Sequence, residues 1–214
     1  MDSEAHEASA RNVGVETWMA ALAQSHGSPG GGAASGVMLA IAAALTSMVA
    51  GYTEPSPERD RILERAREHR LAALALADED ASASNSFGGA YRLPAGPERD
   101  ESVRAASIQG ARAAAALGER AVELLPDLEW LAANGNRALI ADAAVALGAL
   151  RAAISGCRVN LSFDLGALEH LGDTLEQVRL GHPALFATVT LFDQVLSRID
   201  DLSRSIDDRA APTD

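Results

Sequence analysis

The longest apolar stretch of the chain runs from residue 33 to residue 51 and contains no charged residue. Alanine and leucine favour helix, and about five turns without a charge are typical of a helix buried on most sides. The stretch is long enough to raise a membrane span, but Ser35, Gly36, Thr46 and Ser47 interrupt it and alanine dominates it. We therefore expect a core helix and no membrane partner.

Three glycines, Gly30, Gly31 and Gly32, stand directly before this stretch, after Ser28 and Pro29. Glycine has no side chain to bury, so consecutive glycines are typical of places where backbone comes close to another group. A helix start that follows glycines presents free N–H groups and the positive end of the helix dipole, which suit a carboxylate or a phosphate. A tight turn into a core helix explains the same pattern, so both interpretations stay open.

Helical periodicity continues along the rest of the chain, and no stretch shows the alternation of a strand or a repeat. Ser56 as N-cap and Pro57 at the first helical position predict a helix that ends near Ser86. Pro126 is expected to end another helix, and Asn134-Gly135-Asn136 to form a turn. The other predicted helices are 17–22, Arg99–Leu125, Asp127–Ala133, Arg137–Leu161, Asp164–Arg179 and Pro183–Asp207.

Hydrophobic residues make up 48% of the chain but aromatic ones only 4%, which favours closely packed helices. The sequence therefore predicts an all-α protein. At 214 residues it fits one domain, expected at 11–207, between disordered tails at 1–10 and 208–214.

The formal net charge is −12, and all 18 basic residues are arginine. Without lysine, Schiff-base chemistry through a lysine is excluded, and the negative charge argues against nucleic acid as a partner. Cys157 is the one cysteine, so an intramolecular disulfide is excluded, and no charged-then-apolar leader opens the sequence. We therefore expect a cytoplasmic location.

Acidic residues supply the candidate chemistry. Asp78, Glu79 and Asp80 are consecutive among small residues, and on a helix at most one or two of them can face inward. A solvated acidic turn is the alternative. Asp142 is an isolated acid in an apolar segment, so it is either neutralised by a partner or functional. The five histidines are scattered and none has the spacing of a helical metal site, so no metal is expected and either a carboxylate enzyme or no enzyme remains.

Several blocks of the sequence, in this order and spacing, resemble the family of formiminotetrahydrofolate cyclodeaminases and methenyltetrahydrofolate cyclohydrolases. The resemblance extends from about Trp18 to Asp207. The blocks are Pro29-Gly30-Gly31-Gly32, Asp78-Glu79-Asp80-Ala81, Tyr91-Arg92-Leu93-Pro94, Ser107-Ile108-Gln109, Asp142-Ala143 and Arg158-Val159-Asn160-Leu161.

The resemblance implies an up-and-down helical bundle, usually a homodimer, that acts on a one-carbon unit carried by tetrahydrofolate. One activity in the family closes 5-formiminotetrahydrofolate with release of ammonia, as a C–N lyase. The other hydrolyses 5,10-methenyltetrahydrofolate to 10-formyltetrahydrofolate. Both move protons on and off nitrogen or water, for which a carboxyl of raised pKa is suited. Neither activity needs a metal or a prosthetic group, and the folate is the substrate.

Carried over by position, the resemblance implies that Asp80 is the catalytic general acid or base, with Asp78 as the second choice. The implied substrate-binding residues are the glycines, which let backbone approach the pterin or its glutamate tail, an arginine for a folate carboxylate, an aspartate for the pterin edge, and two supporting asparagines. In order along the chain they are Gly30, Gly31, Gly32, Asn85, Arg92, Asp142 and Asn160.

The sequence also departs from the family pattern where Ala33, Ser84, Arg137, Ala138 and Ala141 replace a hydroxyl, an aromatic ring or an amide. Two alternatives therefore stay open beside a folate enzyme. One is a diverged enzyme that closes or opens an imine or amidine ring of a non-folate substrate. The other is a non-catalytic helical binding protein.

Overall fold

The structure is a computed structural model that describes residues 9–210. In this part of the chain every regular element is helical, in agreement with the all-α prediction. The elements are α1 (Val15–Leu22), α2 (Gly31–Gly51), α3 (Pro57–Tyr91), α4 (Pro97–Val122), α5 (Leu125–Asn134), the 3-10 helix η1 (Arg137–Leu139), α6 (Ile140–His170), α7 (Leu175–Gly181) and α8 (Pro183–Ala210).

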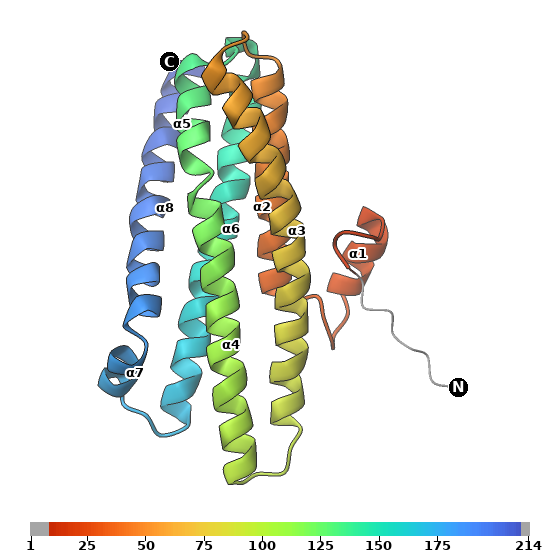
Figure 1. Cartoon of the computed structure of the whole chain (residues 1–214), viewed down its shortest axis with the longest axis vertical. Helices are drawn as coiled ribbons and strands as arrows, with labels where there is room; N and C mark the ends of the chain where they lie inside the picture. The colour runs from red at the N-terminus through yellow and green to blue at the C-terminus, as the bar shows by residue number, and fades with distance from the viewer. Residues whose placement is uncertain (1–8, 211–214) are drawn as a thin grey trace.

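Four long helices, α2, α3, α4 and α6, form a bundle in which successive helices run in opposite directions (Figure 1). α2 packs against α3 and α6, and α4 packs against the same two helices. α8 covers α6 and α4 from outside, and α5 carries the chain on from α4. The predicted up-and-down helical bundle is confirmed.

Small residues let these helices approach one another closely. A Cβ on Gly36 of α2 would be 2.7 Å from the Cβ of Ala77 on α3. A Cβ on Gly156 of α6 would overlap the hydroxyl of Ser35, so α2 is equally close to α6. The abundance of alanine and glycine therefore allows close packing of the helices, and leucines and Phe192 fill the centre of the core.

Two segments, α2 and residues 137–170, are long and apolar enough to cross a membrane by length and composition alone. Core helices of soluble proteins meet the same criteria. In α2, 56% of the apolar window is buried within the bundle, but for 137–170 the share is 33%. The second helix therefore keeps a large apolar surface outside the bundle.

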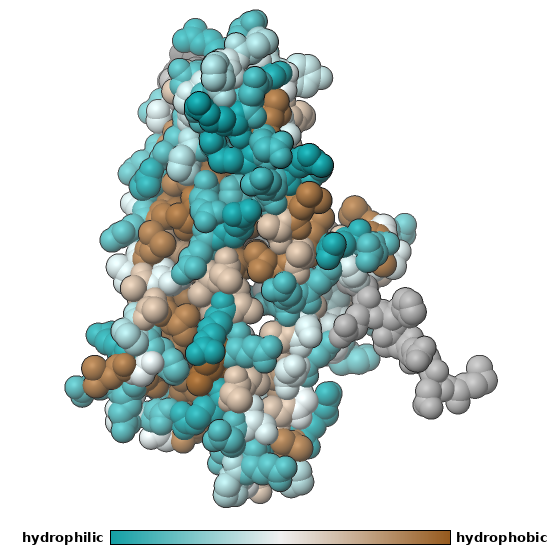
Figure 2. All heavy atoms as spheres, in the orientation of Figure 1, coloured by the Kyte–Doolittle hydropathy of each residue, from teal (hydrophilic) through white to brown (hydrophobic). Residues whose placement is uncertain are grey.

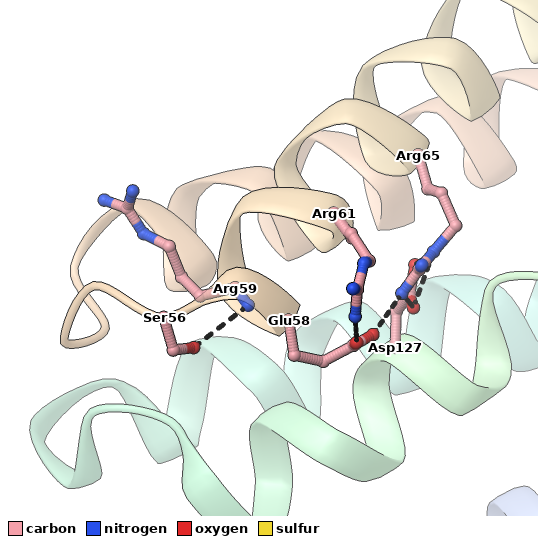
Figure 3. A network of polar contacts seen from close by, with 6 residues as sticks. All are labelled: Ser56, Glu58, Arg59, Arg61, Arg65 and Asp127. Carbon is pink, nitrogen blue, oxygen red and sulfur yellow. Dashed lines mark hydrogen bonds and ion pairs between the residues drawn. The ribbon is translucent and has the colours of Figure 1, made fainter.

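The end of the bundle away from α1 contains an ion-pair network between α3 and α5 (Figure 3). The Arg65 guanidinium donates to both carboxylate oxygens of Asp127, with Nε distances of 3.1 and 3.2 Å, and to Glu58 at 2.8 Å. Only 3% of the Asp127 side chain is exposed. Because a buried carboxylate needs such partners, this network fixes the two helices to each other.

Several predicted boundaries are wrong, each for a local reason. α3 does not end near Ser86 but runs through Gly88 and Gly89 to Tyr91, because two glycines weaken a helix without breaking it. Pro126 does not end α4, which stops at Val122; it lies in the first turn of α5, where its missing N–H has no partner to lose.

The predicted break between helices at 161–164 does not exist, because α6 is continuous from Ile140 to His170. The chain turns instead at Gly172, whose φ of +97° is a left-handed conformation that favours glycine. The C-terminal tail prediction is wrong for 208–210, which continue α8. Ser9 and Ala10 are ordered against Asp78, whereas 1–8 and 211–214 lie outside the described residues.

Candidate active site

Asp80 of α3 faces the start of α2. Its side chain accepts a hydrogen bond from the backbone N–H of Ala33, in the first turn of that helix, and only 9% of the residue is exposed. Within residues 9–210, the second carboxylate oxygen, Oδ2, is buried and has no hydrogen-bond partner. Burial raises the pKa of Asp80 above its ordinary value, and the Ala33 N–H partly opposes that rise. The residue therefore has the character expected of a proton-transfer group.

The carboxyl of Asp80 lines a cavity of about 190 Å³ between the four bundle helices. α2 contributes two of the predicted glycines, and α6 contributes the predicted Asn160. The lining residues are Gly31, Gly32, Asp80, Ala83, Ser84, Phe87, Ala106, Gly110, Asn160, Phe163 and Asp164. Residues far apart in the sequence thus meet here, as the candidate site requires.

Asp164 is a second carboxyl in the same cavity, and sequence reasoning missed it. A Cβ on Gly110 of α4 would be 2.6 Å from Asp164 Oδ2, so the carboxyl occupies the space beside that glycine. Burial, together with the charge of Asp80, raises the pKa of Asp164 to about 7. The predicted helix break hid the signal, since in one continuous helix Asp164 follows Asn160 by four residues and shares its face.

Asn85 and Gly30 support the cavity from outside its lining. The Asn85 amide donates a hydrogen bond of 2.9 Å to the Ser28 hydroxyl, which connects α3 to the loop before the glycines. Gly30 is the N-cap of α2 and has extended backbone. Both residues therefore help to place the start of α2 opposite Asp80.

Asp78, the second choice for the catalytic aspartate, has a different environment. Its carboxylate accepts hydrogen bonds of 2.7 Å from the Ser9 hydroxyl and from the Ala10 backbone N–H. Asp78 therefore holds the N-terminal segment against α3. The structure favours Asp80 over Asp78 as the residue that faces the cavity.

Two predicted residues do not line the cavity of the same chain. Arg92 is exposed at the end of α3, about 18 Å along the helix from Asp80. Asp142 lies on α6 about 27 Å before Asn160, since each helical residue rises about 1.5 Å. Arg92 is nevertheless only about 7.5 Å along the helix from Phe87, which lines the cavity, whereas Asp142 is too far to contact a molecule bound there within a single chain.

A larger cavity, of about 600 Å³, lies at the turn from α5 into α6. It is lined by Ala132, Ala133, Asn134, Gly135, Arg137 and Ile140. No carboxyl lines it, so it lacks the acid–base groups of the smaller cavity. Among the described residues, no group of three or more histidines, cysteines or acids is placed to hold a metal ion.

The chain is similar in sequence to several known proteins. Residues 14–173 match the formiminotransferase-cyclodeaminase family. The chain is 30% identical over 172 residues to the methenyltetrahydrofolate cyclohydrolase of Methylorubrum extorquens, covering 75% of this chain and 83% of that protein. It is 32% identical over 149 residues to the formimidoyltransferase-cyclodeaminase of Rattus norvegicus, covering 64% of this chain but 28% of the rat protein.

A solved structure shows the same fold. The crystal structure of formiminotetrahydrofolate cyclodeaminase from Thermotoga maritima superposes with a TM-score of 0.78 at 24% sequence identity. The match covers 92% of this chain and 96% of that one. The whole described bundle, and not one helical hairpin, is therefore shared.

Proposed function

Because this chain belongs to the formiminotransferase-cyclodeaminase family, we propose that it hydrolyses 5,10-methenyltetrahydrofolate to 10-formyltetrahydrofolate in the cytoplasm, without a prosthetic group. The observation that carries the proposal is the buried Asp80 carboxyl at the cavity between the bundle helices, whose Oδ2 has no hydrogen-bond partner within residues 9–210. Of the two reported relatives of similar length, the cyclohydrolase is 30% identical and the cyclodeaminase 24%, and this difference favours hydrolysis. Cyclodeamination of 5-formiminotetrahydrofolate is the second candidate. The rat protein similar in sequence and the Thermotoga structure similar in fold both carry cyclodeaminase in their names.

In this proposal Asp80 is the general base. Its carboxylate takes a proton from the water that attacks the one-carbon unit, and its negative charge stabilises the cationic carbon between the two nitrogens. The Ala33 N–H holds one carboxylate oxygen, and we assign the proton transfer to Oδ2, which has no hydrogen-bond partner among the described residues. In the deaminase reaction the same atom would take the proton of the attacking nitrogen.

The cavity supplies an aromatic ring and an amide for a flat, polar-edged substrate. Ser84 stands where an aromatic residue is common in the family, but Phe87, three residues further along α3, lines the cavity. The Phe87 ring packs against Tyr91, with centroids 5.0 Å apart, which restricts its orientation. Asn160 offers donor and acceptor groups. These side chains support a pterin-like substrate over an aliphatic amidine.

The cavity is nevertheless small for a folate, since sites for such molecules usually measure about 300–1,000 Å³. One chain therefore encloses only the reacting end of the substrate. A second copy of the chain is the partner that we propose for the rest, because the outer surfaces of α2 and α6 form an apolar face.

That face, the α2–α6 face, lies behind α3 and α4 in the view of Figure 1. Its exposed residues are apolar or small, with Val145 60% and Val159 57% exposed. By contrast, hydrophilic side chains lie among the apolar ones on the side shown in Figure 2. We define the α2–α6 face by the exposed residues Met38 and Met48 of α2 and Ala141, Val145, Gly148, Ala152 and Val159 of α6.

A two-fold homodimer through this face would join the two cavities. If α6 pairs with its copy in the opposite direction, with the axis near Leu150, residues 137–142 of one chain lie opposite residues 158–163 of the other. The larger cavity of one copy would then adjoin the smaller cavity of the partner, and Asp142 would come within reach of its substrate. This arrangement explains how Asp142 could bind a folate despite its distance from Asp80.

The test is direct. Purified chain should accelerate the loss of the near-ultraviolet absorbance of 5,10-methenyltetrahydrofolate, and Asp80→Asn should remove most of that activity while the protein stays folded. Ammonia release from 5-formiminotetrahydrofolate would instead identify the deaminase. A folded chain that turns over neither folate refutes both; turnover of another cyclic amidine would then indicate the non-folate enzyme, and failure to bind any pterin or amidine the non-catalytic protein.

A further inference from the structure

Two carboxyls face the 190 Å³ cavity from different helices, Asp80 from α3 and Asp164 from α6. Each lies beside a glycine on a neighbouring helix, Gly32 on α2 and Gly110 on α4. A side chain at either glycine would collide with the carboxyl, since a Cβ would overlap Asp80 Oδ1 at Gly32 and would be 2.6 Å from Asp164 Oδ2 at Gly110. The absence of a side chain at each glycine therefore leaves the space that the neighbouring carboxyl occupies.

The cavity holds no positive charge to neutralise the pair. Among its described lining residues, which come from α2, α3, α4 and α6, the ionisable side chains are Asp80 and Asp164. The nearby Cys157 thiol is neutral, because burial raises its pKa to about 12. Two carboxylates in a small, partly dry space repel each other, so at neutral pH one of them keeps a proton.

The surroundings decide which carboxyl keeps it. Asp80 accepts the Ala33 N–H at the positive end of the α2 dipole, and this favours its charged form. Asp164 lies beside Gly110, which is inside α4 and not at its start, and burial together with the charge of Asp80 favours its protonated form. The ionised group is therefore Asp80 and the protonated one is Asp164.

We propose that Asp164 is a catalytic residue, the general acid that protonates the departing nitrogen while Asp80 acts as the base. This inference rests on the proposed function and adds the second proton-transfer group that the reaction needs. It concerns a residue that is not in the six sequence blocks that carry the resemblance.

The proton balance of hydrolysis fits one acid and one base. Water adds to the cationic carbon, a C–O bond forms, and the water proton passes to Asp80. Asp164 then protonates N5 as the C–N5 bond breaks, and the hydroxyl proton returns to Asp164 as the C=O bond forms. Asp80 finally releases its proton to solvent, which matches the loss of the substrate's positive charge. In the deaminase reaction, Asp80 takes the N10 proton and Asp164 protonates the departing ammonia.

The experiment compares Asp164→Asn with Glu169→Gln, an exposed acid on the same helix that serves as the matched control. We expect Asp164→Asn to lower kcat by about 10²-fold or more and to abolish the fall in kcat above about pH 7. Glu169→Gln should change neither. Asp164→Glu, which keeps the carboxyl, should restore part of the rate and the alkaline fall, so a structural effect of the asparagine is recognised.

A second measurement does not depend on turnover. With ¹³C-labelled aspartate, one carboxyl resonance should titrate near pH 7, disappear in Asp164→Asn and move to lower pH in Asp80→Asn. An Asp164→Asn enzyme within threefold of wild type that keeps its alkaline fall overturns the catalytic role, and so does an Asp164 carboxyl that titrates near pH 4. If the wild-type chain is inactive on both folates, the proposed function fails, and the shared proton is judged by the titration alone.

Discussion

The Asp80 carboxylate occupies the place that a side chain at position 32 would need, because a Cβ on Gly32 would overlap both of its oxygens. This contact gives the glycine run before α2 its physical reason. Because Gly32 has no side chain, the Asp80 carboxylate of α3 fits beside it. The same carboxylate accepts a hydrogen bond from the Ala33 N–H in the first turn of α2. The start of α2 and the candidate catalytic group therefore depend on each other.

Gly32→Ala should accordingly remove activity and lower stability by about 1–3 kcal/mol, since the methyl must displace the Asp80 carboxyl or separate α2 from α3. Gly31→Ala is the matched control for stability, because a Cβ there meets nothing within 4 Å. In a helix this second change should be neutral or stabilising by up to about 1 kcal/mol. Thermal unfolding of both variants checks the prediction, which is wrong if the two melt alike.

Substitutions of Asp80 and Asp78, the two aspartates of the acidic tract, should have different effects on kcat and on stability. Asp80→Asn should cost at least about 10²-fold in kcat with little change in stability, because the buried Oδ2 loses no hydrogen bond. Asp78→Ala should leave kcat within a few-fold and lower stability by about 1–3 kcal/mol, because it removes the acceptor of Ser9 and Ala10. Reversed results would identify Asp78 as the catalytic residue.

Much of this arrangement could be predicted from the sequence. Absence of strand alternation, abundance of alanine and few aromatics were enough for the all-α class, and the family resemblance supplied the up-and-down bundle. The resemblance also assigned Gly31, Gly32 and Asp80 to one site, and in the structure the three residues line the same cavity. The inward residue among three consecutive acids was chosen by family resemblance, since helical geometry alone allows either Asp78 or Asp80.

Other features depend on tertiary packing that no local pattern reveals. Asp164 was missed because nothing in Ser162-Phe163-Asp164 distinguishes a continuing helix from the start of a new one until its contact with Gly110 is known. Asp142 was grouped with the site although the length of α6 separates it from the cavity, and Arg92 lies on α3 beyond Phe87, outside the lining. Two motif residues on the same long helix can lie tens of ångströms apart, because each helical residue adds about 1.5 Å.

Stability should depend on pH through Asp164. Its folded-state pKa of about 7 is higher than that of an unfolded aspartate, near 4, so the free energy of unfolding should fall as pH rises from about 4 to 7. Because the carboxyl is only partly buried, we expect a loss of about 1–2 kcal/mol, smaller than the full shift implies.

Asp164→Asn should remove this part of the pH dependence and make the protein more stable than wild type at pH 8. Burial lowers the pKa of His69, which acts in the opposite direction below about pH 6.5, but that residue is present in both proteins and cancels in the comparison. Urea unfolding at pH 5 and pH 8 provides the measurement. Parallel pH profiles of the two proteins would contradict the raised pKa.

The network at the other end of the bundle should be a source of stability alone. Asp127→Ala leaves the Arg65 guanidinium without its buried partner and should lower the free energy of unfolding by about 2–3 kcal/mol. Asp201→Ala removes the partner of Arg204 in a pair that is mostly exposed, and should change it by less than about 0.5 kcal/mol. Neither variant should alter kcat, which steady-state kinetics would verify.

The last prediction concerns the α2–α6 face. Val145→Glu places a charge at the middle of the apolar residues of α6, where Val145 is 60% exposed and therefore contributes little to the packing of its own chain. If two copies meet through this face, burial of an unpaired carboxylate should weaken the dimer by several kcal/mol and yield monomers in analytical ultracentrifugation. Leu180→Glu, at a residue of α7 that is 74% exposed, is the control and should leave the assembly unchanged.

Activity distinguishes a dimer that only packs from one that completes the site. Because the cavity of a single chain is smaller than a folate requires, monomeric Val145→Glu should retain its helical circular dichroism but lose most folate turnover. Raising the protein concentration should restore the lost activity in step with the dimer fraction. A wild-type chain that sediments as a monomer at micromolar concentration and still turns over the folate would contradict the dimer, and Asp142 would then have no route to the substrate.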